Sequence, residues 1–152
     1  MLNGGTLGLE YILGTNPLIL NGGTIYAGNG GGNSWNAPIT LNGMTLIDPF
    51  ARLDLNNKSG GISGPGGLTI EGSGKLILNG INTYTGPTTV RQGRLIVRKA
   101  ASLYNAAPAD WTPAKITVFN TAAIHLNVGG QDQFTSVQAG TLLKNLTTGV
   151  HS

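Results

Sequence analysis

The sequence predicts an all-β fold, a right-handed parallel β-helix with coils of about 18–21 residues. The string Leu-Asn-Gly begins at Leu2, Leu20, Leu41 and Leu78, at nearly regular intervals of which the last spans two periods. Short apolar segments alternate around these strings, and glycine supplies 25 of the 152 residues. We therefore expect a single β-solenoid domain over residues 1–152, with one short helix near the C-terminus.

The strands are expected to be short, with side chains alternating between the core and the solvent. Segments 68–70, 76–78, 95–97, 116–118 and 124–128 each show this alternation between turn residues. Strands of this length become stable when each coil stacks on the next and buries its inward side chains. The residues expected to point inward are Leu7, Ile25, Leu46, Ile70, Leu78, Leu95 and Ile124.

Asparagine recurs with the leucines. Asn3, Asn21, Asn42 and Asn79 each follow the leucine of the repeated string and precede a glycine. They could stack as a ladder in which each side-chain amide binds the next coil. Alternatively, Asn-Gly merely favours a tight turn. The two interpretations are compatible.

Two segments depart from the repeat. Residues 99–115 contain Pro108, Trp111 and Pro113, and we interpret them as an excursion or a short helix over 100–105. Residues 135–146 place apolar side chains near helical spacing, with Thr135 as N-cap. Such a helix could cover the open end of the solenoid.

Composition excludes several classes of protein. Charged residues make up only 10% of the chain, and there is no cysteine, which rules out disulfides, zinc–thiolate sites and cysteine nucleophiles. No apolar run approaches the roughly 20 residues of a membrane-spanning helix. The residues after Met1 are not expected to form a signal peptide, so either the protein stays inside or a leader belongs to a longer precursor. The formal charge of +3 is small, so nucleic acid is not expected as a partner.

Catalytic, cofactor-binding and metal-binding residues are not expected. A glycosidase or lyase needs paired acids, whereas the acids here share no repeat phase and are interpreted as solvated turn residues. These acids are Glu10, Asp48, Asp54, Glu71, Asp110 and Asp132. His125 is expected to point outward, and His151 lies near the end. Residues 129–132 resemble one calcium-binding nonapeptide, but the motif occurs only once, so calcium is not expected.

Two groups of residues could nevertheless bind a surface glycan. Trp35, Tyr26 and Trp111 could stack on sugar rings. The only charge cluster comprises Arg91, Arg94, Arg98 and Lys99. It could attract anionic polysaccharide, lipopolysaccharide or nucleic acid. The favoured interpretation is that these four residues are only polar surface positions. Outward strand positions are polar, and charge there discourages aggregation.

Residues 62–97 carry a family resemblance. They read ISGPGGLTIEGSGKLILNGINTYTGPTTVRQGRLIV, which resembles the autotransporter-associated β-strand repeat, also called the passenger-associated transport repeat. The positions that match are Gly67, Leu68, Gly72, Gly74, Leu76, Leu78, Gly80, Asn82, Tyr84, Gly86, Thr88, Val90, Gly93, Leu95 and Val97. Pro87 and Arg94 depart from the pattern, where glycine and threonine are common.

The resemblance implies a parallel β-helix in a surface or secreted protein of a Gram-negative-type bacterium, where such repeats form a non-catalytic stalk. From the residues themselves, the Asn82 side chain is expected to hydrogen-bond to the backbone two residues further along the chain. The Tyr84 ring is expected to cover the corner of the coil. A sugar-binding Tyr84 is the functional alternative.

The leading functional hypothesis is a structural stalk or fibre segment at the cell surface. The alternatives are a carbohydrate-binding or adhesive module and, less favoured, a polysaccharide-active enzyme. Because Leu2 already opens a repeat, we expect an uncovered first coil. Its partners would be neighbouring coils of the same protein, as part of a longer stalk, or copies of the chain stacked head to tail.

Overall fold

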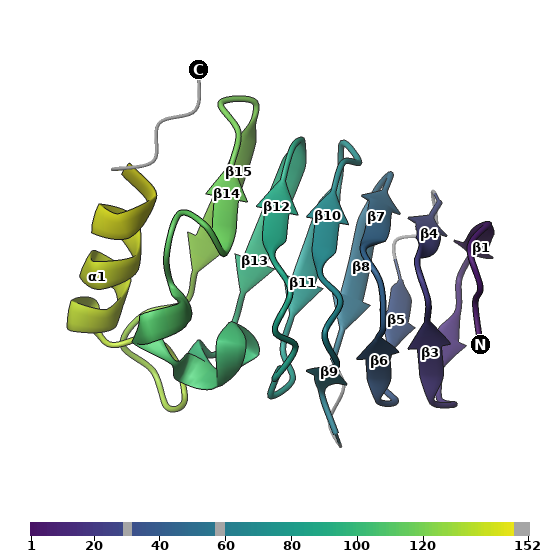
Figure 1. Ribbon diagram of the computed structural model, residues 1–152, viewed down its shortest axis with the longest axis horizontal. Helices are drawn as coiled ribbons and strands as arrows, with labels where there is room; N and C mark the ends of the chain where they lie inside the picture. The colour runs from purple at the N-terminus through teal and green to yellow at the C-terminus, as the bar shows by residue number, and fades with distance from the viewer. Residues whose placement is uncertain (29–31, 57–59, 148–152) are drawn as a thin grey trace.

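The computed structural model describes residues 1–28, 32–56 and 60–147, and it shows a parallel β-solenoid (Figure 1). Within these residues every strand pair is parallel, and three sheets run along the axis. The first sheet contains β1 (Thr6–Leu9), β4 (Gly23–Ala27), β7 (Thr45–Pro49), β10 (Leu68–Ile70), β12 (Thr88–Val90) and β14 (Ile116–Val118). The second contains β2 (Leu13–Gly14), β5 (Asn33–Trp35), β8 (Arg52–Leu55), β11 (Lys75–Leu78), β13 (Gly93–Val97) and β15 (Ala122–Leu126). The third contains β3 (Leu18–Leu20), β6 (Ile39–Leu41) and β9 (Ile62–Ser63). The predicted parallel β-solenoid is confirmed.

The coils vary in length more than the repeated string suggests. In the first sheet, Thr6 pairs with Thr24, which is the spacing of the first two strings. Thr45 pairs with Leu68, and these two residues lie further apart in sequence than Thr6 and Thr24. The longest coil runs from Thr88 to its partner Ile116, because it includes the excursion predicted over 99–115. Some coils are therefore longer than the range expected from the strings, whereas the coil from Leu68 to its partner Thr88 lies within that range.

The excursion replaces a strand of the third sheet. It contains three short 3-10 helices, η1 (Ala100–Ser102), η2 (Tyr104–Ala106) and η3 (Pro108–Asp110), in place of one helix over 100–105. In Figure 1 these helices lie along the same lower edge of the solenoid as β3, β6 and β9. Trp111 is fully buried beside them and donates its indole N–H to the carbonyl of Leu103, 3.2 Å away.

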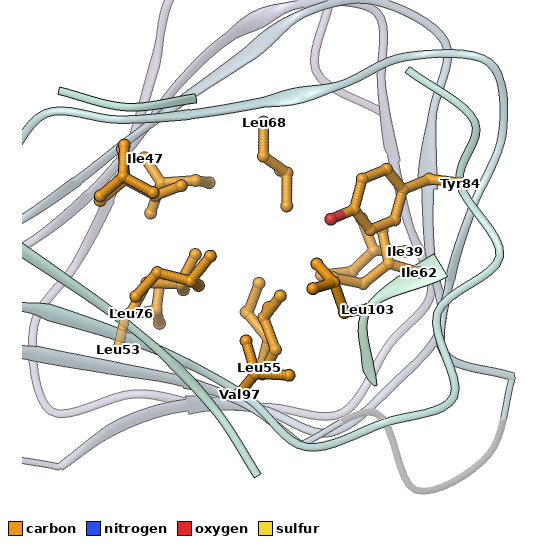
Figure 2. Close-up of a cluster of buried hydrophobic side chains, with 14 of the residues drawn as sticks. Ile39, Ile47, Leu53, Leu55, Ile62, Leu68, Leu76, Tyr84, Val97 and Leu103 are labelled. Carbon is orange, nitrogen blue, oxygen red and sulfur yellow. The ribbon is translucent and has the colours of Figure 1, made fainter. Parts of the chain in front are cut away.

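The core is continuous through the coils, and Figure 2 shows side chains of successive coils packed behind one another. Most of the predicted inward positions are confirmed. Ile25, Ile70, Leu78 and Leu95 are buried, while Leu7 and Ile124, from the first and last coils, are partly exposed and pack against the core.

The expectation that Leu46 points inward is wrong. Leu46 is half-buried and pairs with Thr24 on the outward face, whereas Ile47 pairs with inward Ile25 and is fully buried. The cause is one extra residue in a turn. Between the same two coils, the partners Leu20 and Leu41 of the third sheet lie one residue closer in sequence than Ile25 and Ile47. A shift of one residue moves every side chain of a strand to the other face.

A helix covers the C-terminal side of the described solenoid, as expected. Helix α1 (Ser136–Thr147) begins after Thr135, whose hydroxyl accepts the N–H of Gln138 at 3.1 Å. The side chain of Gln138 accepts the N–H of Thr135 in return, which completes a capping box. Leu142 of α1 is fully buried, and Figure 1 shows the helix beyond the last strands. No helix in the described residues is both long and apolar enough to cross a membrane.

Candidate functional site

One exposed corner of the solenoid carries a ladder of asparagines. The side-chain amide of Asn21 donates to Asn3 at 2.6 Å, and that of Asn42 donates to Asn21 at 2.7 Å. Each asparagine follows one of the leucines that are aligned along the third sheet, namely Leu2, Leu20 and Leu41. The ladder interpretation is therefore confirmed for three of the four asparagines.

Asn79 does not belong to this ladder, contrary to the expectation. It follows β11 in the second sheet, at a different corner, and donates to Asn56 at 3.3 Å. Asn56 in turn donates to the hydroxyl of Ser34 at 3.0 Å. The long offset from Leu41 to Leu78 is thus a change of corner, not two full coils. The string Leu-Asn-Gly ends strands in two different sheets.

Asn82 joins three levels of the solenoid from within. Its side chain is fully buried; Oδ1 accepts the N–H of Ile62 at 2.9 Å, and Nδ2 donates to the carbonyl of Ser102 at 2.8 Å. The Ser102 hydroxyl, also buried, donates to the carbonyl of Gly80 at 2.7 Å. The expectation that Asn82 bonds to its own backbone is wrong. A buried amide satisfied on both sides stabilises the packing of adjacent coils.

A second buried polar network joins Tyr84, Thr88 and Tyr104. The Thr88 hydroxyl lies 2.6 Å from the Tyr84 hydroxyl and 2.9 Å from that of Tyr104. The Tyr104 hydroxyl also lies 2.9 Å from the carbonyl oxygen of Gly86. The two rings tilt against each other with centroids 5.0 Å apart. Sequence reasoning did not find the roles of Thr88 and Ser102, because a small polar residue gives no pattern of its own.

Burial controls the protonation of both tyrosines. Burial raises the pKa of the Tyr84 hydroxyl well above its ordinary value of 10, with a further rise from Tyr104 nearby. Burial likewise raises the pKa of Tyr104 to about 12. Both hydroxyls are therefore neutral donors and acceptors at physiological pH. Because Tyr84 is 1% exposed, its ring is not a surface on which a sugar could stack.

The acids are dispersed, and in the described residues four of them lie beside a cation. Asp54 corrects the expectation of solvated turn residues, because it lies within β8, is buried, and pairs with Arg52. The hydrogen bond to Asp54 raises the pKa of the Arg52 guanidinium. The other three pairs are Arg91–Glu71 at 3.6 Å, Lys99–Asp132 at 3.7 Å and Lys115–Asp110 at 4.0 Å.

The remaining candidate residues lie apart from one another. His125 is exposed on β15, as expected, and His151 lies outside the described residues. Within the part of the chain that the structure describes, no three acid or histidine side chains gather where a metal ion could be held. Asp48 also lies in a strand, β7, instead of a turn.

The three proposed stacking residues differ in accessibility. The expectation that Trp111 could stack on a sugar ring is wrong, because this side chain is fully buried and its ring centroid lies 5.4 Å from that of Phe134. Trp35 is partly buried, packs against the core, and donates its indole N–H to the carbonyl of Asn16 at 3.2 Å. Tyr26 is half-buried on the outward side of β4.

Comparison with known proteins gives one match. The family model described as the passenger-associated-transport-repeat matches residues 66–97. No curated protein and no solved structure matches the chain. The match indicates a segment of an autotransporter passenger, and therefore a bacterial secreted or surface protein. Residues 66–97, which run from the turn before β10 to the end of β13, are thus a passenger-associated transport repeat built into a parallel β-solenoid.

Proposed function

We propose that this chain is a structural segment, a stalk, of a passenger on the surface of a Gram-negative-type bacterium. The observation that carries the proposal is the continuity of the solenoid. One apolar core extends from the first coil to α1, and buried or stacked amides connect successive coils. In such a repeat structure each coil contacts only its neighbours, so the length grows without a change of fold, which suits a spacer.

The distribution of acids supports a non-catalytic role. Glycoside cleavage needs one protonated and one ionised acid on either side of the bond. Asp54, Glu71, Asp110 and Asp132 each pair instead with a lysine or arginine. We expect no reducing ends or unsaturated products from uronic-acid polymers incubated with the chain. Turnover that survives repurification would contradict the stalk proposal and favour the enzyme alternative.

The outer edge of the first coil supports the proposed partners, neighbouring coils of the same protein or a second copy of the chain. Strands β1 and β2 each have one hydrogen-bonded neighbour among the described strands, so their other edge can accept a further strand. Large apolar side chains are exposed here, including Tyr11 at 79% and Leu13 at 61%. Because α1 covers the opposite side, a further coil of the same protein suits this edge better than a head-to-tail copy.

Light scattering of the chain over a concentration series tests whether the outer edge of the first coil accepts a further strand. We expect weak association, which Leu13→Lys at the first coil abolishes because charge on an edge discourages strand addition. Leu143→Lys is the matched control, since Leu143 is 51% exposed on α1. Association lost equally in both variants, or a chain that stays monomeric at every concentration, would contradict the proposed role of this edge.

A further inference from the structure

The outward face of the second sheet carries a column of positive charge. Arg52, Lys75 and Arg94 are register partners on β8, β11 and β13. Each precedes a fully buried leucine, so its own side chain points outward. Because neighbouring strands lie about 4.8 Å apart, the three form one cationic column along the solenoid axis. Like charges directly opposite one another destabilise a sheet, so stability does not account for this arrangement.

Part of the cationic column lacks an acidic partner. Arg52 is neutralised by Asp54, through Nε–Oδ1 at 2.9 Å and Nη2–Oδ2 at 2.5 Å. Lys75 and Arg94 form no ion pair with any acid in the described ranges. By contrast, Arg91 pairs with Glu71. Two uncompensated cations therefore lie side by side on this face.

A hollow of about 390 Å³ adjoins Arg94 at the corner between the first and second sheets. Polar side chains line it, namely Ser73, Gln92, Asn120 and Thr121, together with the small Ala122 and Ala123. The Thr121 hydroxyl donates to the carbonyl of Arg91 at 2.9 Å, which leaves the lone pairs of its oxygen to accept. A guanidinium surrounded by hydroxyls and amides can bind both the carboxylate and the hydroxyls of an acidic sugar.

We propose that the cationic column and this hollow bind a carboxylate-bearing polysaccharide, a polyuronate, along the solenoid axis. Arg94 holds one sugar carboxylate at the hollow, and Lys75 holds another on the neighbouring strand. Arg52 shows how an arginine on this face can bind a carboxylate, because its guanidinium donates two hydrogen bonds to the Asp54 carboxylate. This inference goes beyond the stalk role and does not depend on it.

Polyuronate fits this face better than other polyanions. Nucleic-acid strands are commonly bound by aromatic side chains that stack on bases, and β8, β11 and β13 carry no aromatic residue. A membrane surface favours protruding apolar side chains, whereas outward Ile77 on β11 is only 3% exposed. The proposed recognition rests on charge and hydroxyl groups instead of ring stacking.

Binding to polygalacturonate tests the proposal, with its fully methyl-esterified form as a matched neutral polymer. We expect the charged polymer alone to bind, and binding to weaken as salt is raised. Arg94→Gln should weaken it by about fivefold, and Arg94→Gln with Lys75→Gln should weaken it further. Arg91→Gln, which removes the same charge from a paired site, should change the affinity by less than about twofold.

Several results would overturn the proposal. These are no binding, equal binding to the esterified polymer, an equal loss in Arg91→Gln and Arg94→Gln, or tighter binding to single-stranded DNA or to phosphatidylglycerol vesicles. Thermal melting controls for folding. Because Lys75→Gln removes a like-charge contact, its melting temperature should be unchanged or raised.

Discussion

The repeat over 66–97 and the first coils of the same solenoid are held together differently. In the repeat, Asn82, Tyr84 and Thr88 are buried, and their polar groups bond across coils, those of Tyr84 and Thr88 together with Tyr104 of the excursion. In the first coils, the amides of Asn3 and Asn21 form an exposed ladder, and buried Asn33 accepts the N–H of Ile12 at 3.1 Å. Buried polar contacts therefore form an extended network around the repeat, whereas in the first coils buried Asn33 is accompanied by an exposed, repeatable ladder.

Individual glycines also differ between the repeat and β1. A Cβ added at Gly74 would lie 2.3 Å from the carbonyl oxygen of Ala51, and one at Gly93 would lie 2.2 Å from that of Gly72. A Cβ at Gly8, in β1, would meet nothing within 4 Å. Glycine in the repeat permits close approach of the backbones of adjacent coils. Gly23 does the same in the first coils, because an added Cβ would lie 2.7 Å from the carbonyl oxygen of Gly5, whereas Gly8 has no such role. We infer that stability decreases from the repeat toward the first coil.

The largest difference in stability between the repeat and the first coil should come from a charge placed in the core. Leu78→Asp buries a carboxylate without a partner in the apolar column, and should lower the free energy of unfolding by more than about 4 kcal/mol. Leu7→Asp, at a partly exposed core position of the first coil, should cost about 1–2 kcal/mol. Denaturant unfolding followed by circular dichroism measures both. Equal losses would mean that the first coil is packed as tightly as the repeat.

Removing the buried amide should have the next largest effect. Asn82→Ala leaves the N–H of Ile62 and the carbonyl of Ser102 unpaired inside the protein, at a cost of about 3 kcal/mol. Asn21→Ala removes exposed hydrogen bonds that water can replace, and should cost about 0.5 kcal/mol. Both variants can be compared by thermal melting. A loss in Asn21→Ala as large as that in Asn82→Ala would refute the distinction between buried and exposed amides.

Added methyl groups should separate the two kinds of glycine. Gly74→Ala forces neighbouring backbones apart and should destabilise the chain by about 2 kcal/mol. Gly8→Ala has open space and should be neutral, or stabilising by about 0.5 kcal/mol because it restricts the unfolded chain. Unfolding midpoints in urea report the difference. A destabilised Gly8→Ala would show that β1 needs glycine for another reason.

Alkaline pH should weaken the buried tyrosine network that joins the repeat to the excursion. Because the pKa of Tyr104 is raised to about 12 in the folded chain, the unfolded chain loses this proton first, above the ordinary value of 10. Stability is therefore full below pH 10 and falls as the pH rises from about 10 to 12. Tyr104→Phe should flatten this fall in melting temperature. An identical pH profile in wild type and Tyr104→Phe would show that Tyr104 does not contribute.

The architecture was predictable because it repeats, whereas single positions depended on the turns. The recurring Leu-Asn-Gly string and two-residue alternation predict the solenoid. One extra turn residue reversed the face of Leu46, and nothing in the strand itself records that shift. Asn79 looks identical to Asn42 in sequence but lies at another corner.

The candidate site was predicted only in part, since pairing across coils is long-range. Arg94 belonged to the predicted cluster, yet Arg52 and Lys75 became its neighbours only through the register of β8, β11 and β13. Trp111 resembled a surface aromatic in a polar segment, but it is completely buried beside the 3-10 helices. Asp54 was expected in a turn, but its partner Arg52 lies two residues before it on the same strand face.

Native-state hydrogen exchange measures the gradient in stability most directly, because it reports each strand separately. The amides of β10, β11, β12 and β13 should exchange slowest, and those of β1 and β2 should exchange fastest. Protection should decrease stepwise along the sheets from β10 through β7 and β4 to β1. Uniform protection across all coils, or slower exchange in β1 than in β10, would contradict the conclusion that the repeat is the stable centre of the solenoid.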